Sequence, residues 1–315
     1  MTLGDSRGTI QEAATGRTCT IEPDYIVGRA PPPATCLHIN EPYVSGVHAT
    51  LRWVGDGWVA RDLGSRNGTY VEGERLASGE EKKLALGARV GFGSLSDVWV
   101  LIDDSPPKVM AVPVAGGEPV LTEGDLLAVP SSEHPHATIY RSTSGTWILE
   151  QAAGSTVGVR NREMFEVDGI LWRFCCLDTL SSTVAAGGAS RPTIRQAHLE
   201  FGVSRDEEFV QLQVTSGGKK HDFGSRVHNY LLLTLARRRL EDSREGLAES
   251  ACGWVDQEDI AHDPSMAPPR LNIDIFRIRR QFEAIEVIDT ANIIEKRQRP
   301  AQLRIGTGNL RVVAL

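Results

Sequence analysis

The chain has 315 residues, of which 41% are hydrophobic and 24% are charged, and its formal net charge is −7. This length predicts two or three domains of about 100 residues each, and the composition is ordinary for a globular protein. The negative net charge argues against attraction of the whole surface to nucleic acid or to an anionic membrane.

The charge is divided unevenly: residues 1–189 carry 15 Lys and Arg against 23 Asp and Glu, whereas residues 190–315 carry 19 against 18. The five cysteines form no Cys-x-x-Cys pair and the eight histidines no His-x-x-x-His pair, so neither a disulfide framework nor a metal site is indicated. The N-terminus lacks the apolar core of a signal peptide, and no apolar run approaches the about 20 residues that span a bilayer. We expect a cytoplasmic, non-enzymatic protein without cofactor, metal or membrane contact.

Between Thr18 and Asp103, short alternating apolar runs are separated by Gly, Pro, Asn and Asp, which predicts an all-β sandwich. Within it, "WVARDL" and "TYVEG" flank the turn "GSRNG", residues 64–68. Asn-Gly is a strong hairpin signal because both residues tolerate positive φ. The turn alone therefore predicts a hairpin. "DDSPPK", residues 103–108, ends the segment with two prolines.

Three short motifs fall where loops of this sandwich are expected. They are Gly28-Arg29, Ser45-x-x-His48 and the Asn67-Gly68 of "GSRNG". In this order and spacing they resemble the signature of the forkhead-associated (FHA) domain, over residues 15–103. The resemblance implies that loops at one end of the sandwich bind a phosphothreonine peptide.

The FHA resemblance also assigns roles to single residues. By this analogy Arg29 and Ser45 contact the phosphate, Arg66 adds charge and Asn67 holds the peptide backbone, while Gly28 and His48 brace the loops. The expected phosphopeptide-binding residues are Arg29, Ser45, Arg66, Asn67 and Thr69, and the expected structural residues are Gly28, His48 and Gly68.

The chemistry of these side chains suits a phosphate. A phosphothreonine carries about −1.5 to −2 charges and three strong acceptor oxygens. Arginine offers a planar fork of donors to such a group, and serine adds a hydroxyl donor. The alternative is that Arg29 and Arg66 are solvated surface arginines and Ser45 a turn residue. The three motifs together favour the phosphate site.

Residues 108–180 are again strand-like and echo the first segment, since His-Ala-Thr, Trp and Gly-Ser-x-x-Gly recur in the same order. We expect a second, degenerate FHA-like sandwich. In this alignment Glu133 replaces Ser45 and Val157 replaces Asn67, and neither replacement suits a phosphate site. The segment would then be a spacer or a protein-docking surface. The alternative is an unrelated β segment.

Residues 181–193, small and polar with Gly and Pro, predict a flexible linker. Two strands in 194–203 and 209–216 are expected to form a hairpin. Helices are predicted over 225–242 with Ser225 as N-cap, from Asp256, and over 268–285 with proline in the first turn. A basic hairpin over 293–313 ends the chain.

Strands, three helices and a basic hairpin follow one another as in OmpR-type winged-helix domains, which residues 194–315 therefore resemble. That resemblance implies DNA binding. One stripe of the 268–285 helix is apolar and predicts a core face, while the other face carries arginine and asparagine, which can read bases. The DNA-binding candidates are Asn272, Phe276, Arg277, Arg279, Arg280, Lys296, Arg297 and Arg299, with Arg304 as a further basic residue of the hairpin.

Three observations favour a protein contact in place of DNA. The segment is nearly neutral, Ile273 and Phe276 put apolar groups on the expected groove side, and Pro264, Pro268 and Pro269 interrupt the region of the second helix. Two functions therefore stay open. One is a protein that binds a phosphorylated partner, a Ser/Thr kinase or its substrate, and couples kinase output to transcription through double-stranded DNA. The other is an adaptor that never touches DNA.

Overall fold

The computed structural model describes residues 7–32, 36–142, 144–151, 155–177, 192–261, 268–285, 287 and 289–315. The chain divides into two compact units, one of residues 1–121 with 160–181 and the other of residues 122–159 with 182–315. The expected linker lies outside the described residues except for Pro192 and Thr193, as does Pro264. Over the described ranges, no helix has the length and apolar composition needed to cross a membrane.

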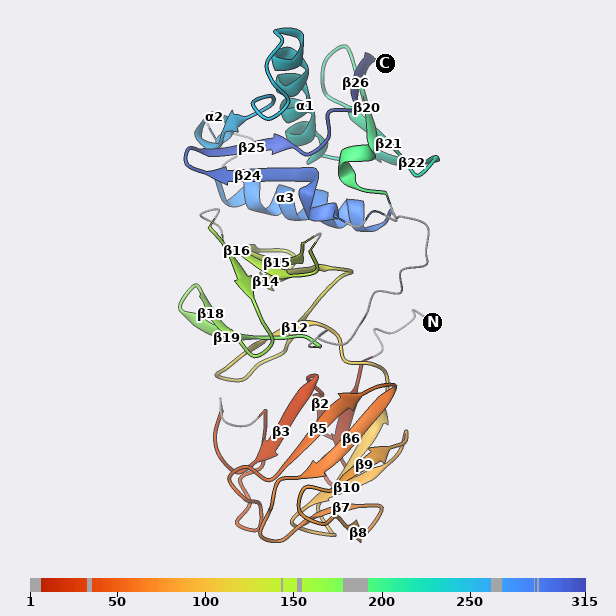
Figure 1. Ribbon diagram of the computed structural model, residues 1–315, viewed down its shortest axis with the longest axis vertical. Helices are drawn as coiled ribbons and strands as arrows, with labels where there is room; N and C mark the ends of the chain where they lie inside the picture. Colours follow the sequence, from red (N-terminus) through yellow and green to blue (C-terminus); the bar gives the residue numbers. More distant parts are fainter. Residues whose placement is uncertain are drawn as a thin grey trace. The chain divides into compact units, whose positions relative to one another are not determined.

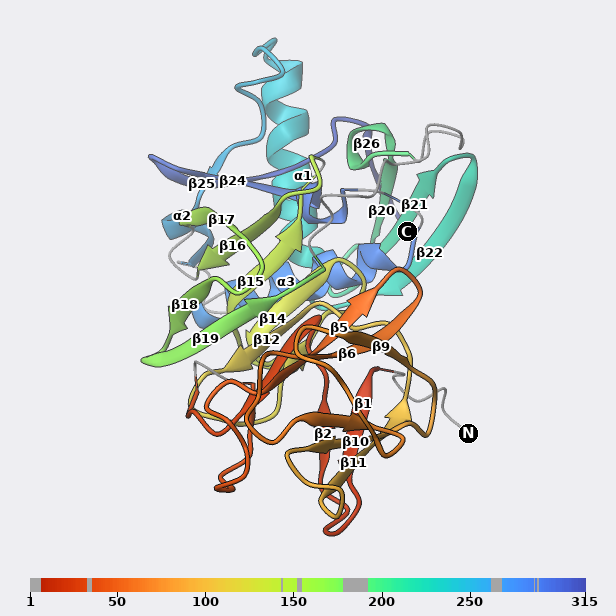
Figure 2. The same ribbon diagram turned by 60° about the horizontal axis from the view of Figure 1, so that its bottom comes forward.

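Residues 9–103 of the first unit form a sandwich of two sheets around one hydrophobic core (Figure 2). One sheet has the order β2-β1-β11-β10-β7-β8 and the other β4-β3-β5-β6-β9. Leu51, Trp58 and Leu101 are fully buried between them, which the alternating apolar pattern requires. The predicted β-sandwich is confirmed. Its strands are β1 (Thr9–Glu12), β2 (Thr18–Thr20), β3 (Asp24–Gly28), β4 (Leu37–His38), β5 (Ala49–Val54), β6 (Gly57–Asp62), β7 (Thr69–Val71), β8 (Glu74–Arg75), β9 (Glu81–Leu84), β10 (Arg89–Phe92) and β11 (Val98–Asp103).

The Asn-Gly turn does not close a hairpin, and that prediction is wrong. Strand β6 pairs with β5 and β9, whereas β7 pairs with β10 and β8 in the other sheet. The segment 63–68 therefore carries the chain from one sheet to the other. Gly68 has a φ of +88°, as expected for a turn glycine. The conformation of the loop is nevertheless determined by its polar contacts and not by strand pairing.

A four-stranded sheet of order β13-β12-β19-β18 completes the first unit. Arg173 of this sheet forms a 2.7 Å ion pair with Glu22 of the sandwich, and both side chains are over 90% buried. The thiol of Cys175 also donates to Glu22, at 3.1 Å. The strands are β12 (Met110–Pro113), β13 (Val120–Leu121), β18 (Met164–Val167) and β19 (Ile170–Cys175).

The second unit contains the sheet β14-β15-β16-β17. Its strands are β14 (Leu126–Pro130), β15 (Pro135–Arg141), β16 (Trp147–Gln151) and β17 (Thr156–Val159). The segment expected to be one degenerate sandwich, 108–180, is thus divided between the two units. Its likeness to an FHA domain stays a prediction.

The C-terminal elements follow in the predicted order. Strands β20, β21 and β22 precede three helices and form a sheet with the last strand, β26, which lies beside α1 (Figure 1). A hairpin of β24 and β25 pairs with the short strand β23. The elements are β20 (His198–Val203), β21 (Val210–Ser216), β22 (Lys219–Ser225), α1 (Asn229–Arg244), β23 (Val255–Asp256), α2 (Gln257–Ala261), α3 (Pro268–Glu283), β24 (Ile294–Gln298), β25 (Ala301–Ile305) and β26 (Leu310–Ala314), with 3₁₀ turns at Ile194–Gln196 and Thr290–Ile293.

Three details differ from the sequence prediction. The strand β22 was not expected, because its side chains are mostly exposed and show no apolar alternation. Since β22 extends to Ser225, α1 begins four residues later than predicted, at Asn229, and Ser225 does not cap it. The last strand, β26, leaves the basic hairpin and pairs in parallel with β20.

Helix α3 buries the stripe that the sequence predicts. The residues on it, Leu271, Ile275, Ile278, Phe282 and the following Ile285, all belong to the core of the C-terminal elements. That core also contains buried residues of α1, β20 and β21, such as Leu231, Phe201 and Leu212.

The ion pair of Glu22 and Arg173 should stabilise the first unit strongly. We expect Arg173→Ala to lower its free energy of unfolding by about 3–5 kcal/mol, because Glu22 is left buried without its partner. Urea denaturation followed by tryptophan fluorescence measures the change. Arg160→Ala removes an exposed arginine of the same unit and is the control; equal midpoints for the two variants would contradict the expectation.

Candidate functional site

Three loops meet at one end of the N-terminal sandwich. They follow β3, β4 and β6 and carry Arg29, Ser45 and Arg66 respectively. The backbone N–H of Arg29 donates to the Ser45 carbonyl at 2.9 Å, and the N–H of Arg66 donates to the Ser45 hydroxyl oxygen at 3.0 Å. Ser45 thus joins the other two loops, and the structure brings these three expected residues together.

The buried His48 fixes two of these loops to each other. Its Nδ1 accepts from the Ser45 N–H at 3.1 Å, so Nε2 carries the ring proton and donates to the Gly68 carbonyl at 3.2 Å. The ring is fully buried and packs edge-on against Phe92. Burial lowers the pKa of His48 below its ordinary value and favours the neutral ring. The bracing role expected for His48 agrees with these contacts.

Asp62 organises the third loop, and the sequence interpretation missed it. Its carboxylate accepts from the N–H groups of Gly64 and Ser65, at 2.8 and 3.0 Å, and from the Ser65 hydroxyl at 2.6 Å. Burial alone would raise the pKa of Asp62, but these hydrogen bonds outweigh it and lower the pKa, so the carboxylate stays charged. An aspartate two residues before Gly-Ser is a signal for such a turn.

Two further expected residues lie in the loops with different exposure. Asn67 is half-buried, and its side-chain amide donates to the Tyr43 carbonyl at 2.8 Å. Thr69 is fully buried, and its hydroxyl donates to Asp62 at 2.7 Å. The structure therefore places the Thr69 side chain beneath the loops as a support, away from the exposed groups expected to meet a peptide.

Two exposed side chains at this end are cationic. The side chains of Arg29 and Arg66 are exposed, and Nε of Arg29 donates to the Val44 carbonyl at 3.2 Å. This bond orients the guanidinium and leaves its four terminal N–H groups for other acceptors. The arrangement offers charged donors and a serine hydroxyl to an anion.

The sequence model of the FHA domain matches residues 25–93. These residues contain all three loops described above. Residues 25–93 form an FHA domain. The described strands of this range and the position of Arg29, Ser45 and His48 on its loops agree with the resemblance seen in the sequence.

The following known proteins are similar to this FHA domain and its flanks. FhaB of Mycobacterium tuberculosis, an FHA domain-containing protein, is 32% identical over 80 residues, which are 25% of this chain and 50% of FhaB. The chain thus spans half the length of the curated relatives it matches.

Two solved structures are similar over about the same region. The FHA domain of FhaA, in complex with the intracellular domain of Rv3910, is 28% identical over 30% of this chain and 97% of its own, with a TM-score of 0.26. EmbR of Mycobacterium tuberculosis, in complex with a low-affinity phosphopeptide, is 22% identical over 33% of this chain and 27% of its own, with a TM-score of 0.29.

The second candidate site, on α3 and the β24–β25 hairpin, differs from its prediction. Phe276 and Arg279 are 2% exposed and the Lys296 side chain is 8% exposed. Three of the eight DNA-binding candidates are therefore not on the surface, because the β14–β17 sheet covers them. Asn272 is half-buried beside the same contact. The sequence could not show this cover, since it comes from a distant segment.

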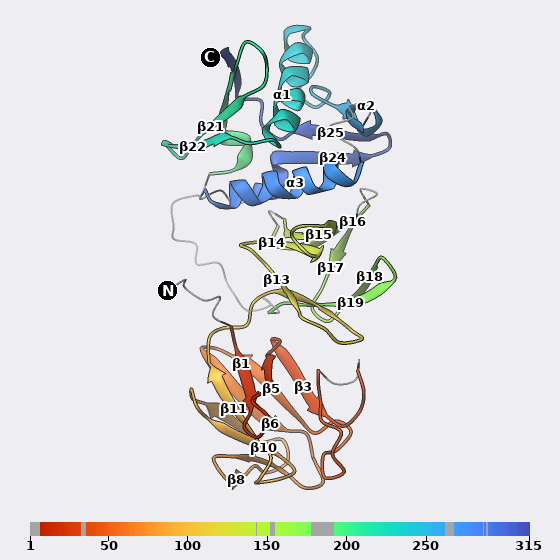
Figure 3. The same ribbon diagram turned by 180° about the vertical axis from the view of Figure 1, so that it is seen from behind.

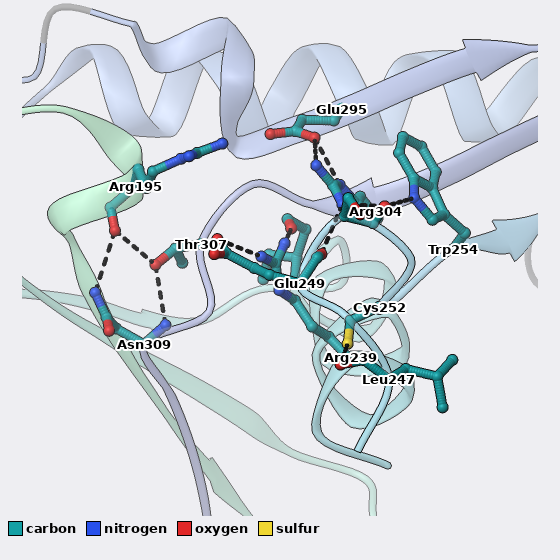
Figure 4. A network of polar contacts seen from close by, with 12 residues as sticks. Arg195, Arg239, Leu247, Glu249, Cys252, Trp254, Glu295, Arg304, Thr307 and Asn309 are labelled. Carbon is teal, nitrogen blue, oxygen red and sulfur yellow. Dashed lines mark hydrogen bonds and ion pairs between the residues drawn. The ribbon is translucent and has the colours of Figure 1, made fainter. Parts of the chain in front are cut away.

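The basic hairpin is held by an aromatic residue that the sequence interpretation did not use. The guanidinium groups of Arg297 and Arg304 lie 4.4 and 4.5 Å from the ring centre of Trp254. Figure 4 shows Arg304 beside Trp254 and Glu295, and its Nε donates to Glu295 at 2.6 Å. Arg304 is buried and therefore stabilises the hairpin, whereas Arg297 and Arg299 are exposed.

An open basic groove of about 490 Å³ lies beside the C-terminal half of α3. Arg226, Arg277 and Arg280 line it together with Phe223 and His228. Arg280 is also paired with Glu123. Among the DNA-binding candidates, the exposed ones are therefore Arg277, Arg280, Arg297 and Arg299.

The FHA domain should become less stable as the pH decreases, because of His48. Its folded-state pKa lies below the ordinary value of about 6.5, so the unfolded chain binds this proton first as the pH drops. We expect hydrogen exchange of β3, β5 and β6 to accelerate between about pH 7.5 and about pH 5.5, after correction for the intrinsic rate. His48→Gln should remove this dependence, and His38→Gln, at an exposed position, should leave it unchanged. The same pH dependence in His48→Gln would contradict this assignment.

Proposed function

We propose that the FHA domain binds a phosphothreonine-containing protein through the loops that carry Arg29, Ser45 and Arg66. The observation that carries this proposal is the convergence of both arginine-bearing loops on Ser45. The carbonyl and hydroxyl oxygens of Ser45 accept these bonds, so its hydroxyl hydrogen can be donated to a phosphate oxygen. FHA domains bind phosphothreonine peptides, which supports the assignment.

The geometry favours a ligand with high local charge. Arg29 is held through Nε, so binding a phosphate requires little further ordering of its side chain. The polar network of His48, Asp62 and Ser65 fixes the loop backbones before the ligand arrives. Asn67, which is tied to Tyr43, would hold the peptide backbone beside the phosphate.

The whole chain would then be a signalling protein that couples the output of a Ser/Thr kinase to transcription, with the C-terminal elements as a winged helix on double-stranded DNA. The order of sheet, three helices and hairpin supports this function, as do the exposed arginines Arg277, Arg280 and Arg299. The second candidate function is an adaptor that binds only protein. The contact of Phe276 and Arg279 with a sheet of the same chain favours it.

The phosphothreonine function is tested with a peptide library and titration calorimetry. Arg29→Ala and Ser45→Ala should each weaken binding of a selected phosphothreonine peptide about 10- to 150-fold, because a hydrogen bond to a charged group contributes about 1.5–3 kcal/mol. Arg89→Ala, which removes an exposed arginine from β10, is the matched control and should bind like the wild type.

The unphosphorylated form of the same peptide should not bind measurably. Equal affinity for the phosphorylated and unphosphorylated peptides would rule out the phosphate site. Equal weakening by Arg89→Ala would instead assign the effect to the overall charge of the domain.

DNA binding is tested with mixed-sequence duplex DNA at several salt concentrations. Arg277→Ala and Arg280→Ala should weaken binding and lower the slope of log affinity against log salt by about one each, because each removes one phosphate contact. Arg205→Ala, at the exposed β20–β21 turn, is the control. Glu150 of β16 forms ion pairs with Arg279 and Lys296, and Glu150→Gln removes them. If neither the wild type nor this variant binds any duplex at low salt, the adaptor is the correct function.

A further inference from the structure

Helix α3 lies between two layers of the second unit. The hairpin of β24 and β25 lies on one side of it and the sheet of β14, β15 and β16 on the other (Figures 1 and 3). The core stripe of α3 faces the C-terminal elements. The opposite face, which a DNA groove would receive in a winged helix, meets the sheet.

One carboxylate dominates this contact. Glu150 of β16 accepts from Arg279 of α3 at 3.3 and 3.2 Å and also pairs with Lys296 of β24. The Glu150 and Arg279 side chains are at least 96% buried and that of Lys296 is 92% buried. Although burial opposes it, the two cations lower the pKa of Glu150 to about 2, so the carboxylate is charged at neutral pH.

Other contacts of the sheet with α3 involve an aromatic ring and apolar side chains. The guanidinium of Arg279 lies 4.8 Å from the ring centre of Tyr140. Phe276 packs against Leu126 and Ala128 in a small apolar cluster. At one edge Arg280 pairs with Glu123. The sheet and the residues just before it thus contact three of the cations that the sequence assigns to DNA. The contacting groups are two carboxylates and an aromatic ring.

We propose that the β14–β17 sheet is an intramolecular cover that competes with DNA for α3 and β24, with Glu150 in the place of a DNA phosphate. This inference rests on the proposed DNA-binding function. The cover keeps Phe276, Arg279 and Lys296 out of reach, so only the exposed arginines contact DNA while it is closed. Opening it exchanges the pairs with Glu150 for pairs with phosphates.

The composition of the contact suits a reversible cover. Buried ion pairs stabilise a contact less than apolar packing of the same volume does, because both charges lose their hydration. Arg279 and Lys296 regain anionic partners when DNA phosphates replace Glu150. Water alone offers them no such anion. If the cover is closed in 99 of 100 molecules, the apparent affinity for DNA falls about 100-fold.

The test compares the full-length wild type with Glu150→Gln. Glutamine keeps the shape of Glu150 but leaves Arg279 and Lys296 buried without a carboxylate, so the cover should open. We expect Glu150→Gln to bind mixed-sequence duplex DNA at least tenfold more tightly, with faster hydrogen exchange in β15 and β16. Glu133→Gln, an exposed glutamate of the β14–β15 turn, changes the net charge equally and should match the wild type.

A second variant controls for misfolding of Glu150→Gln. Tyr140→Ala removes the ring that lies over Arg279 and leaves all charges in place, and it should also tighten DNA binding while circular dichroism stays that of the wild type. If hydrogen exchange shows that the sheet is released in the variants but the wild type and both variants bind DNA with equal affinity, the sheet does not compete with DNA. That result would contradict the inference and leave the DNA-binding function intact. If none of them binds DNA, the DNA-binding function fails and the inference fails with it.

Discussion

A charge removed from water needs an opposite charge or hydrogen-bonding partners, and this constraint organises both units of the protein. In the first unit Glu22 pairs with Arg173, which lies in a separate sheet. In the second, Glu150 pairs with Arg279 and Lys296, which lie in a helix and a hairpin. Each glutamate joins segments that are more than a hundred residues apart in the chain. Because an unpaired partner would be costly to bury, the two contacts also specify which segments associate.

The peptide-binding end of the FHA domain depends on a different kind of contact. There the loops are joined by neutral rings, hydroxyls and backbone groups, as in the bonds of His48 to Ser45 and Gly68. Asp62, a buried charge of these loops, is met by hydrogen bonds. The Asp62 carboxylate accepts hydrogen bonds from the loop itself, and the exposed Arg29 and Arg66 present their positive charge at the surface.

The sequence predicted the features that depend on short patterns. The strands of the FHA domain, its three loop motifs and the apolar stripe of α3 all follow from local spacing. The crossing of the chain between sheets after β6 could not be predicted, because Asn-Gly describes a turn and not the partner of the next strand. The burial of Arg279 was also missed, since amphipathic periodicity identifies one apolar face but not a polar face covered by Glu150.

The two units are interleaved along the chain, which passes between them at residues 121–122, 159–160 and 181–182. A fragment that ends at residue 103 keeps the FHA sandwich but loses Arg173, the buried partner of Glu22. A fragment that begins at residue 194 keeps α3 but loses Glu150. Any isolated piece would thus present surfaces and charges that the intact chain buries. Expression and deletion experiments should consequently use the whole segment from β1 to β26.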